Sequence, residues 1–238
     1  MTAAKDSRET IENRLLAVLP KKDYRLIAPH LSPVSLDLNQ IIHEADEPVR
    51  HVYFPTSGVV SILNTLGERM SIEVGTVGKE GMVGINVLWG VDTAPNQAVV
   101  QVPGDGVRMK ASAFKNAVKR SSSFQSLLHR YTYVLMRQTS LSVACNRFHN
   151  VEKRFARLLL AICDRVDGDE FQLTQKYISQ MLGAQRPHVT TAAGALQSAG
   201  LIRYSRGKIV ILDCDGLERA ACDCYRNGKE KFEGLFGA

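Results

Sequence analysis

The chain has 238 residues, 45% of them hydrophobic and 23% charged, which is enough apolar material for one large domain or two ordinary ones. Its net charge of +6 favours an acidic partner only weakly and does not separate a nucleic-acid-binding protein from a basic enzyme. No apolar run approaches the ~18 residues of a membrane span, and the N-terminal segment lacks the apolar core of a signal peptide. The five cysteines are odd in number and all follow residue 144, which does not fit a secreted disulfide framework. We therefore expect a cytoplasmic protein with no membrane partner.

The first half of the chain is predicted to be mainly β-structure. Residues 11–31 indicate one or two short helices interrupted at Pro20. From residue 35 to residue 109, short stretches rich in β-branched residues alternate with turn formers such as Gly58 and Gly104. Many short strands without long helices between them favour a sandwich or a barrel.

A helical repeat replaces this pattern between Phe124 and Phe148. Residues at alternating steps of four and three occupy the a and d positions of a coiled coil across three heptads, namely Leu127, Tyr131, Val134, Gln138, Leu141, Cys145 and Phe148. The pattern predicts a long helix that dimerises through these residues, with Gln138 as a polar pair that sets the register. A helix packed on its own β domain needs a similar apolar stripe, and Leu128 and Leu135 widen the stripe in favour of that alternative.

The C-terminal part of the chain has the signals of a helix-turn-helix. Asn150 is a predicted cap for the amphipathic helix VEKRFARLLLAICDRV, and Thr174 is a predicted cap for QKYISQML. Gly183 suits a sharp turn, Pro187 suits the first turn of the next helix, and Gly200 suits its end. LIRYSRGKIVIL then predicts two short strands that form a wing, and a short terminal helix and tail follow.

Residues 171–212, here called the acid-free segment, contain no acidic residue and five basic ones. Two helices joined by a tight turn expose the N-terminal end of the second helix, which can enter a major groove. A carboxylate on this surface would repel phosphate, so its absence favours a nucleic-acid partner. One alternative is a three-helix core without a ligand. Another is a small-molecule-sensing module that signals to a protein partner rather than to DNA.

The order of these parts resembles the Crp/Fnr family of bacterial transcription regulators over nearly the whole chain. The best local match is ISQMLGAQRPHVTTAAGAL, followed by GLIRYSRGKIVILD. The resemblance implies an α+β fold with a β-roll sensor domain of the cyclic-nucleotide-binding type (residues 1–123), a long dimerisation helix (124–149) and a winged helix-turn-helix DNA-binding domain (150–238). It also implies a homodimer that reads a two-fold symmetric operator on double-stranded DNA. The break between the two helices near residues 149–151 predicts a hinge there. RNA polymerase and an unidentified small-molecule effector are further candidate partners.

The resemblance also indicates which residues contact DNA. At the start of the recognition helix it places Gln185, Arg186, Pro187, His188 and Thr191. Arg186 matches a frequent arginine of the family and could form two hydrogen bonds to guanine. Pro187 stands where many members have glutamate, so the half-site of a well-known relative does not transfer to this chain. Gln185, His188 and Thr191 are candidate base contacts, with phosphate or solvent as alternatives. Phosphate contacts are expected from Thr174, Lys176, Arg206 and Lys208.

The sensor does not carry the residues that the family uses for cyclic AMP. Members that bind this nucleotide use a Gly-Glu pair for the ribose and an Arg-Ser pair for the cyclic phosphate. Here Ile85 follows Gly84 where glutamate should stand, and residues 96–98 (Asn-Gln-Ala) occupy the region of the arginine. Without that cation, the hydration that a buried cyclic phosphate loses would be poorly compensated. We therefore expect a different effector and assign no pocket residues. Glu80 is interpreted as a turn residue.

No cofactor, metal site or enzymatic activity is predicted. Relatives that bind an iron–sulfur cluster use cysteines near the N-terminus, where this chain has none. Cys222-x-Cys224 with Cys214 upstream is a weak metal signal, and apolar packing of these cysteines is the commoner outcome. His43 and His51 flank a turn and are interpreted as solvated or locally hydrogen-bonded. The sequence contains no phosphate loop, HExxH or GxSxG motif.

Overall fold

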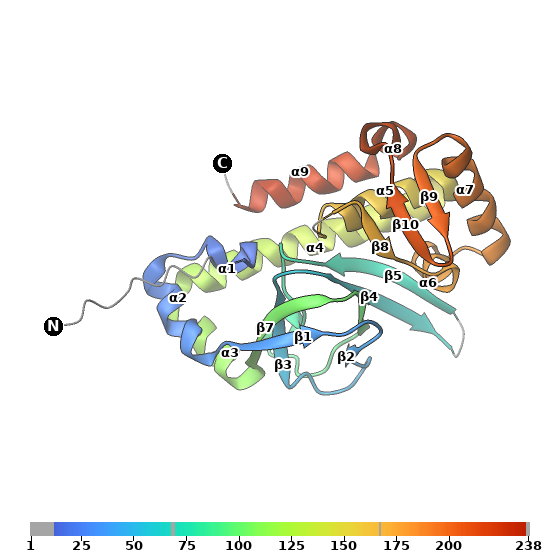
Figure 1. Ribbon diagram of the computed structural model, residues 1–238. Helices are drawn as coiled ribbons and strands as arrows, with labels where there is room; N and C mark the ends of the chain where they lie inside the picture. The colour runs from blue at the N-terminus through green and yellow to red at the C-terminus, as the bar shows by residue number, and fades with distance from the viewer. Residues whose placement is uncertain (1–11, 68–69, 167, 237–238) are drawn as a thin grey trace.

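The structure is a computed structural model that describes residues 12–67, 70–166 and 168–236. A β-rich N-terminal half, one long helix and a smaller C-terminal domain follow one another along the chain (Figure 1). The first elements are α1 (Arg14–Ala17), α2 (Lys21–Ile27) and the 3-10 helix η1 (Ala28–His30). Two short helices therefore flank Pro20 as predicted. Residues 1–11 of the predicted sensor domain lie outside the described residues.

In the described part of the N-terminal half, seven antiparallel strands form two sheets. The strands are β1 (Ser32–Leu36), β2 (Ile41–His43), β3 (His51–Pro55), β4 (Val59–Leu66), β5 (Met70–Val77), β6 (Gln97–Val102) and β7 (Gly104–Lys110). One sheet has the order β1-β7-β3 and the other the order β2-β6-β4-β5. Leu36 and Tyr53 of the first sheet pack in one buried cluster with Val60, Val77 and Val100 of the second. The two sheets enclose a shared core, so the predicted β-roll is confirmed.

Two of the predicted turn glycines lie where the chain passes close to itself. Gly58 has a φ of 75°, in the left-handed region that glycine occupies without strain. A Cβ atom at Gly104 would lie only 2.5 Å from the carbonyl carbon of Ser57. The β3–β4 and β6–β7 turns can therefore meet only because both positions are glycine.

The long helix packs on its own β domain. The 3-10 helix η2 (Ile85–Trp89) and α3 (Ala111–Arg120) precede α4 (Ser122–Phe148), which has 27 residues. Ser121 caps α4, because its Oγ accepts a hydrogen bond from the Phe124 N–H at 3.0 Å. Farther along, the Tyr131 hydroxyl donates to the Met82 carbonyl at 3.1 Å and accepts from the Met82 N–H at 3.0 Å. These bonds fix one face of α4 against the turn that follows β5.

The C-terminal domain has the winged helix-turn-helix arrangement. Its elements are α5 (Val151–Cys163), β8 (Glu170–Gln172), α6 (Gln175–Leu182), α7 (Arg186–Ser198), β9 (Ile202–Ser205) and β10 (Lys208–Ile211). The three strands form a sheet in the order β8-β10-β9. Ile178 of α6, Val189 and Leu196 of α7, and Ile209 of β10 are all buried in one core. The α+β fold with this C-terminal domain is therefore confirmed.

The last described elements are the helices α8 (Cys214–Ala220) and α9 (Cys224–Phe236). Figure 1 shows α9 running back along α4, and the two helices are in contact. Phe232 and Leu235 of α9 are buried in the same cluster as Leu127 of α4. The terminal helix therefore belongs to the packing of the N-terminal half, although it follows the wing in sequence.

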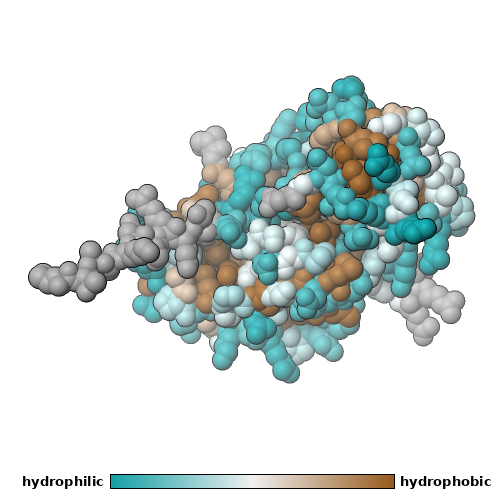
Figure 2. Space-filling model, viewed as in Figure 1, coloured by the Kyte–Doolittle hydropathy of each residue, from teal (hydrophilic) through white to brown (hydrophobic). Residues whose placement is uncertain are grey.

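The face of the molecule that Figure 2 shows is mixed in character, with hydrophobic areas lying among hydrophilic residues. Among the residues that the structure describes, no helix has the length and apolar content that a membrane crossing requires.

Candidate DNA-binding surface and sensor cavity

The helix-turn-helix follows from local signals in the sequence. Thr174 caps α6, because its Oγ1 accepts a hydrogen bond from the Tyr177 N–H at 3.4 Å. Gly183 ends α6 with a φ of 55°, which turns the chain sharply. Gln185 then stands at the N-cap of α7, and Pro187 lies in the first turn, where no N–H is needed. The N-terminal end of α7 is left at the surface.

The residues predicted to contact DNA are all exposed. They lie at the start of α7, at the start of α6 and on the wing, namely Gln185, Arg186, Pro187, His188, Thr191, Thr174, Lys176, Arg206 and Lys208. The structure brings the wing and the start of α6 together, since the Leu173 N–H donates to the Gly207 carbonyl at 2.7 Å. Within α7, the Thr191 hydroxyl donates to the Pro187 carbonyl at 3.1 Å, which leaves its oxygen able to accept a further bond.

The wing is a two-residue hairpin. Arg206 and Gly207 both have a positive φ, 51° and 80°, as the tight turns favoured between antiparallel strands require. This geometry places Arg206 at the exposed tip. Lys208, next to it, forms an ion pair with Glu170 at 2.6 Å, and both side chains are about half exposed. Glu170 is the residue directly before the acid-free segment, so its carboxylate lies at the edge of the predicted DNA-binding surface.

A cavity of about 300 Å³ lies between the sensor sheet, η2 and α4. Its lining is mostly apolar and includes Gly84, Ile85 and Asn96, the positions where the cyclic AMP pattern fails in the sequence. Of the described residues that line it, none is Arg, Lys, Asp or Glu. His43 is the titratable lining residue, and burial lowers its pKa below the usual value, so its ring is neutral at pH 7.

Two polar atoms beside this cavity have no hydrogen-bond partner within the described part of the chain. They are His43 Nδ1 and Gln138 Oε1, and both are buried. Buried polar groups are normally paired because an unpaired one loses its hydration without compensation. A bound molecule would satisfy both atoms if it donated a hydrogen bond to Gln138 Oε1 and also paired with His43 Nδ1. The histidine tautomer decides whether Nδ1 donates or accepts that second bond.

The structure buries four of the seven predicted dimer positions within the chain itself. Leu127, Tyr131 and Val134 are at most 8% exposed, because they pack against the sensor domain of the same chain. Cys145 is fully buried beneath the start of α9, Gln138 and Leu141 are partly buried, and Phe148 is exposed. A side chain buried within its own chain has little surface to give to a partner. Over residues 127–134 the a/d pattern thus marks the packing of α4 on its own domain, the alternative that Leu128 and Leu135 had favoured.

The opposite face of α4 carries three further exposed apolar residues. Tyr133, Met136 and Val143 are 59%, 64% and 67% exposed. With Ser140 between them, they are spaced by three, four and three residues, so they fall on one stripe of the helix. The sequence contained this second pattern, but the more apolar pattern on the other face concealed it.

Two buried arginines join the parts of the molecule around the predicted hinge. Arg165, just after α5, donates from Nε to Glu80 Oε1 at 2.8 Å, so Glu80 is an ion-pair partner as well as a turn residue. Arg154 of α5 donates to the Asn146 carbonyl of α4 at 3.0 Å and also to the Leu182 carbonyl at the end of α6. The orientation of the C-terminal domain therefore depends on buried charged groups.

The cysteines divide into two groups. Cys145, Cys222 and Cys224 are buried and His149 is half-buried beside them, and the ligand atoms of the four residues all lie within 4.8 Å of one another. Cys214 is exposed and lies outside this group, so it does not join Cys222 and Cys224. Sequence reasoning missed the contribution of α4 because Cys145 and Cys222 are 77 positions apart.

Both halves of the chain match known protein families. Residues 33–121 match the model of the cyclic nucleotide-binding domain, and residues 153–220 match the Crp-like helix-turn-helix domain. A CRP-like cAMP-activated global transcriptional regulator of Mycobacterium tuberculosis is 24% identical over 202 residues, which cover 82% of this chain and 90% of the relative.

Solved structures share the fold. FixK2 from Bradyrhizobium japonicum has a TM-score of 0.69 at 18% identity, over 81% of this chain and 98% of that one. A structure described as a transcriptional regulator of the Crp/Fnr family, from Eubacterium rectale, has a TM-score of 0.68 at 20% identity. The match covers 85% of this chain and 94% of that one. The two domain matches, in the same order along the chain, agree with this fold. The chain therefore belongs to the Crp/Fnr family, as a transcription regulator with a cyclic-nucleotide-binding-type domain and a DNA-binding helix-turn-helix.

Proposed function

We propose that the protein is a cytoplasmic homodimer that reads a two-fold symmetric operator on double-stranded DNA through the start of α7. The observation that carries this proposal is the exposed N-terminal end of α7 inside the acid-free segment, beside a wing with Arg206 at its tip. The segment has no carboxylate of its own, and apart from Lys208, which pairs with Glu170, its basic and polar side chains can contact phosphates and base edges. In this proposal the protein has no catalytic role.

In this proposal the regions act as three functional units. Residues 1–123 form the sensor, residues 124–149 the dimerisation helix and residues 150–238 the DNA-binding domain. The start of α7 supplies base contacts, with Arg186 bonding guanine and with Gln185, His188 and Thr191 reading neighbouring bases. Thr174, Lys176 and Arg206 hold phosphates. Lys208 does so less effectively, because Glu170 already neutralises part of its charge.

The dimer forms through the exposed stripe of α4, which we define as Tyr133, Met136, Ser140 and Val143. Burying these apolar side chains against the same stripe of a second copy removes them from water, which favours association. A two-fold axis along α4 then sets the separation of the two α7 helices. Half-sites ~34 Å apart, about one helical turn of DNA, are read together.

The sensor cavity takes an uncharged, largely apolar small molecule rather than a cyclic nucleotide. A cyclic phosphate would lose its hydration in a cavity whose described lining offers no lysine or arginine and whose histidine is neutral. An uncharged molecule avoids this cost, and its polar groups can pair with Gln138 Oε1 and His43 Nδ1. Such a ligand regulates DNA binding only if it prefers one of two arrangements of the dimer.

Selection of duplex DNA from a random pool by the purified, effector-free protein tests the proposal. A palindromic site with half-sites about ten base pairs apart is expected at near-physiological salt. If nothing is recovered there, the selection is repeated at low salt, where a DNA-binding surface still holds duplex non-specifically. No retention of duplex at low salt contradicts the proposal.

A further inference from the structure

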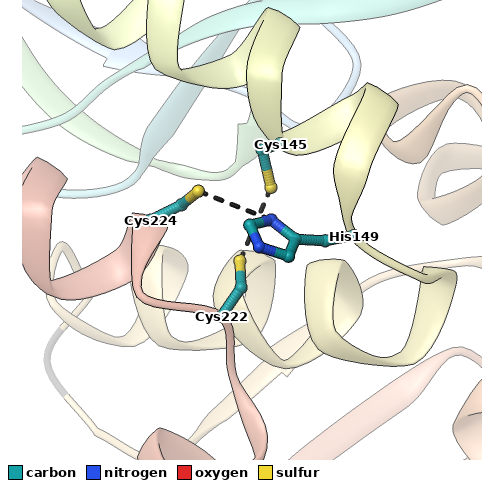
Figure 3. A group of neighbouring side chains, drawn as sticks. All are labelled: Cys145, His149, Cys222 and Cys224. Atoms are coloured by element: carbon teal, nitrogen blue, oxygen red, sulfur yellow. Dashed lines mark hydrogen bonds between the residues drawn. The ribbon is translucent and has the colours of Figure 1, made fainter.

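Four side chains of the kind that bind metals converge where the end of α4 meets the connection between α8 and α9 (Figure 3). Cys145 lies on α4, and His149 follows the last residue of that helix. Cys222 lies between α8 and α9, and Cys224 is the first residue of α9. Figure 3 shows all four side chains directed toward one another from these two segments.

The distances among the ligand atoms fit a single tetrahedral metal ion. Cys145 Sγ lies 3.5 Å from Cys222 Sγ, and Cys224 Sγ lies 3.6 Å from His149 Nδ1. Tetrahedral zinc, with Zn–S bonds of ~2.3 Å and Zn–N bonds of ~2.0 Å, holds its ligand atoms roughly 3.5–3.8 Å apart. No pair of the four atoms is more than 4.8 Å apart, so the widest pairs need to close by only about 1 Å.

The backbone holds the four positions in place without a metal. Cys145 and His149 are four residues apart, so they lie on the same side of the helix end. The His149 N–H donates to the Cys145 carbonyl at 3.1 Å, which continues the helical hydrogen bonding to the histidine. On the other segment, the Tyr225 N–H donates to the Cys222 carbonyl at 3.0 Å, which closes a turn around Cys224. Both pairs of ligands are therefore fixed by local structure.

The surroundings suit a site with net negative charge. Three thiolates and one neutral histidine around a divalent ion leave one negative charge. Arg157 lines the same cavity as Cys224, and its Nε is buried without a hydrogen-bond partner in the described part of the chain. A guanidinium in that position offsets the charge of the occupied site, and the thiolates give it an acceptor nearby.

Apolar packing and a disulfide each explain less of this arrangement than a four-ligand metal site does. The three cysteines form a buried cluster of their own, with Leu141 as its partly buried hydrophobic neighbour, rather than joining a large core. A disulfide between Cys145 and Cys222 would use two of the four groups and leave His149 and Cys224 without a role. A closed four-ligand site uses all of them.

We propose that Cys145, His149, Cys222 and Cys224 bind one Zn²⁺ ion in a closed, four-coordinate structural site. Binding releases the three thiol protons, and no oxidation or reduction takes place. With all four positions filled by side chains, the ion has no open position for a substrate. The site ties the end of α4 to the start of α9 and so restrains the joint between α4 and α5. This inference does not depend on the proposed DNA-binding function.

The test measures metal content in the full chain, purified under reducing conditions from zinc-supplemented cells. One zinc ion per chain is expected by inductively coupled plasma mass spectrometry. C145S and C222S are expected to lose the zinc, whereas C163S and C214S, which change cysteines outside the cluster, keep it. Cobalt exchanged into the wild-type chain is expected to give the thiolate-to-cobalt charge-transfer absorption of a tetrahedral site.

Two further measurements separate loss of the site from loss of the fold. H149C replaces one zinc ligand by another and is expected to retain one zinc ion per chain. Removing zinc from the wild-type chain with a chelator is expected to lower Tm, and adding zinc back should restore it. The proposal is overturned if the reduced wild-type chain binds neither zinc nor cobalt. It is also overturned if C145S and C222S keep as much zinc as C163S and C214S.

Discussion

Glu80 and Arg165 form an ion pair of 2.8 Å between the sensor and the segment that follows α5, and each side chain is less than 10% exposed. The Gly78 N–H also donates to Glu80 Oε1, at 3.2 Å, so the carboxylate is held by its own turn. Arg165 donates further to the Ala161 carbonyl at 2.5 Å. Since both charges are removed from water, each depends on the other for compensation.

Replacing Glu80 should destabilise the protein strongly. E80A leaves the Arg165 guanidinium buried without its carboxylate, a change that costs about 3–5 kcal/mol in comparable pairs. D92A is the control, because Asp92 pairs with Lys115 on the surface and exposed pairs contribute only about 0–1 kcal/mol. Urea unfolding of both variants measures the difference. Equal losses for E80A and D92A would show that the Glu80–Arg165 pair does not join the domains energetically.

Arg186 and Lys176 should affect DNA binding in different ways. R186A is expected to cost about 1–3 kcal/mol on the selected site and to relax the base preference at one position of each half-site. K176A should weaken binding to all sequences alike and reduce the dependence of affinity on salt. Titrations with the selected duplex and a scrambled duplex at several salt concentrations measure both effects. Indistinguishable behaviour of the two variants would contradict the division into base-reading and phosphate-binding residues.

Removing the carboxylate of Glu170 should strengthen DNA binding. E170Q frees Lys208 from its ion pair and takes a negative charge away from the edge of the DNA-binding surface. The affinity is expected to rise for all sequences, with a steeper salt dependence because one more lysine reaches phosphate. E218Q is the control, because Glu218 pairs with Arg226 on the terminal helices. If the two variants bind DNA with equal affinity, Lys208 does not contact phosphate.

A charge on the exposed stripe of α4 should prevent dimerisation. V143E places a carboxylate where two stripes are proposed to meet, and burying it without a partner is unfavourable. V91E makes the same substitution at an exposed valine on the loop after η2 and should leave the dimer intact. Analytical ultracentrifugation reports the mass of each variant. A V143E chain that remains a dimer would place the interface elsewhere.

Two glycines of the helix-turn-helix should respond to alanine in opposite directions. Gly183 has a φ of 55°, and a Cβ there would lie 2.8 Å from Ile72 Cδ1 of β5, so G183A is expected to cost about 1 kcal/mol or more. Gly194 lies inside α7 with open space around it, so G194A should stabilise the chain by about 0.5–1 kcal/mol. Thermal unfolding compares the two variants. Stabilisation by G183A would mean that the α6–β5 contact is not fixed in solution.

Local signals predicted the C-terminal domain well because caps and turns are determined by neighbouring residues. Thr174, Gly183 and Pro187 each have the role in the structure that their residue type favours. The same holds for Asn150, whose Oδ1 accepts a hydrogen bond from the Lys153 N–H at 2.9 Å. Such features require no knowledge of how distant segments pack.

Features that depend on distant contacts were not predictable in the same way. Both faces of α4 have residues at coiled-coil spacing, and only the packed structure shows that Tyr131 faces the sensor while Met136 faces solvent. The cluster of Cys145 with Cys222 arises because α9 folds back along α4. Glu80 looked like a turn residue because its partner, Arg165, is 85 positions away.

In the proposed dimer, two copies of α7 read one face of a DNA duplex together. Hydroxyl-radical footprinting of the wild-type chain on its selected duplex shows whether they do. Two protected regions ~34 Å apart are expected on the same face of the duplex, both lost with R186A. Protection of a single half-site, or of a continuous stretch that R186A leaves unchanged, would contradict it.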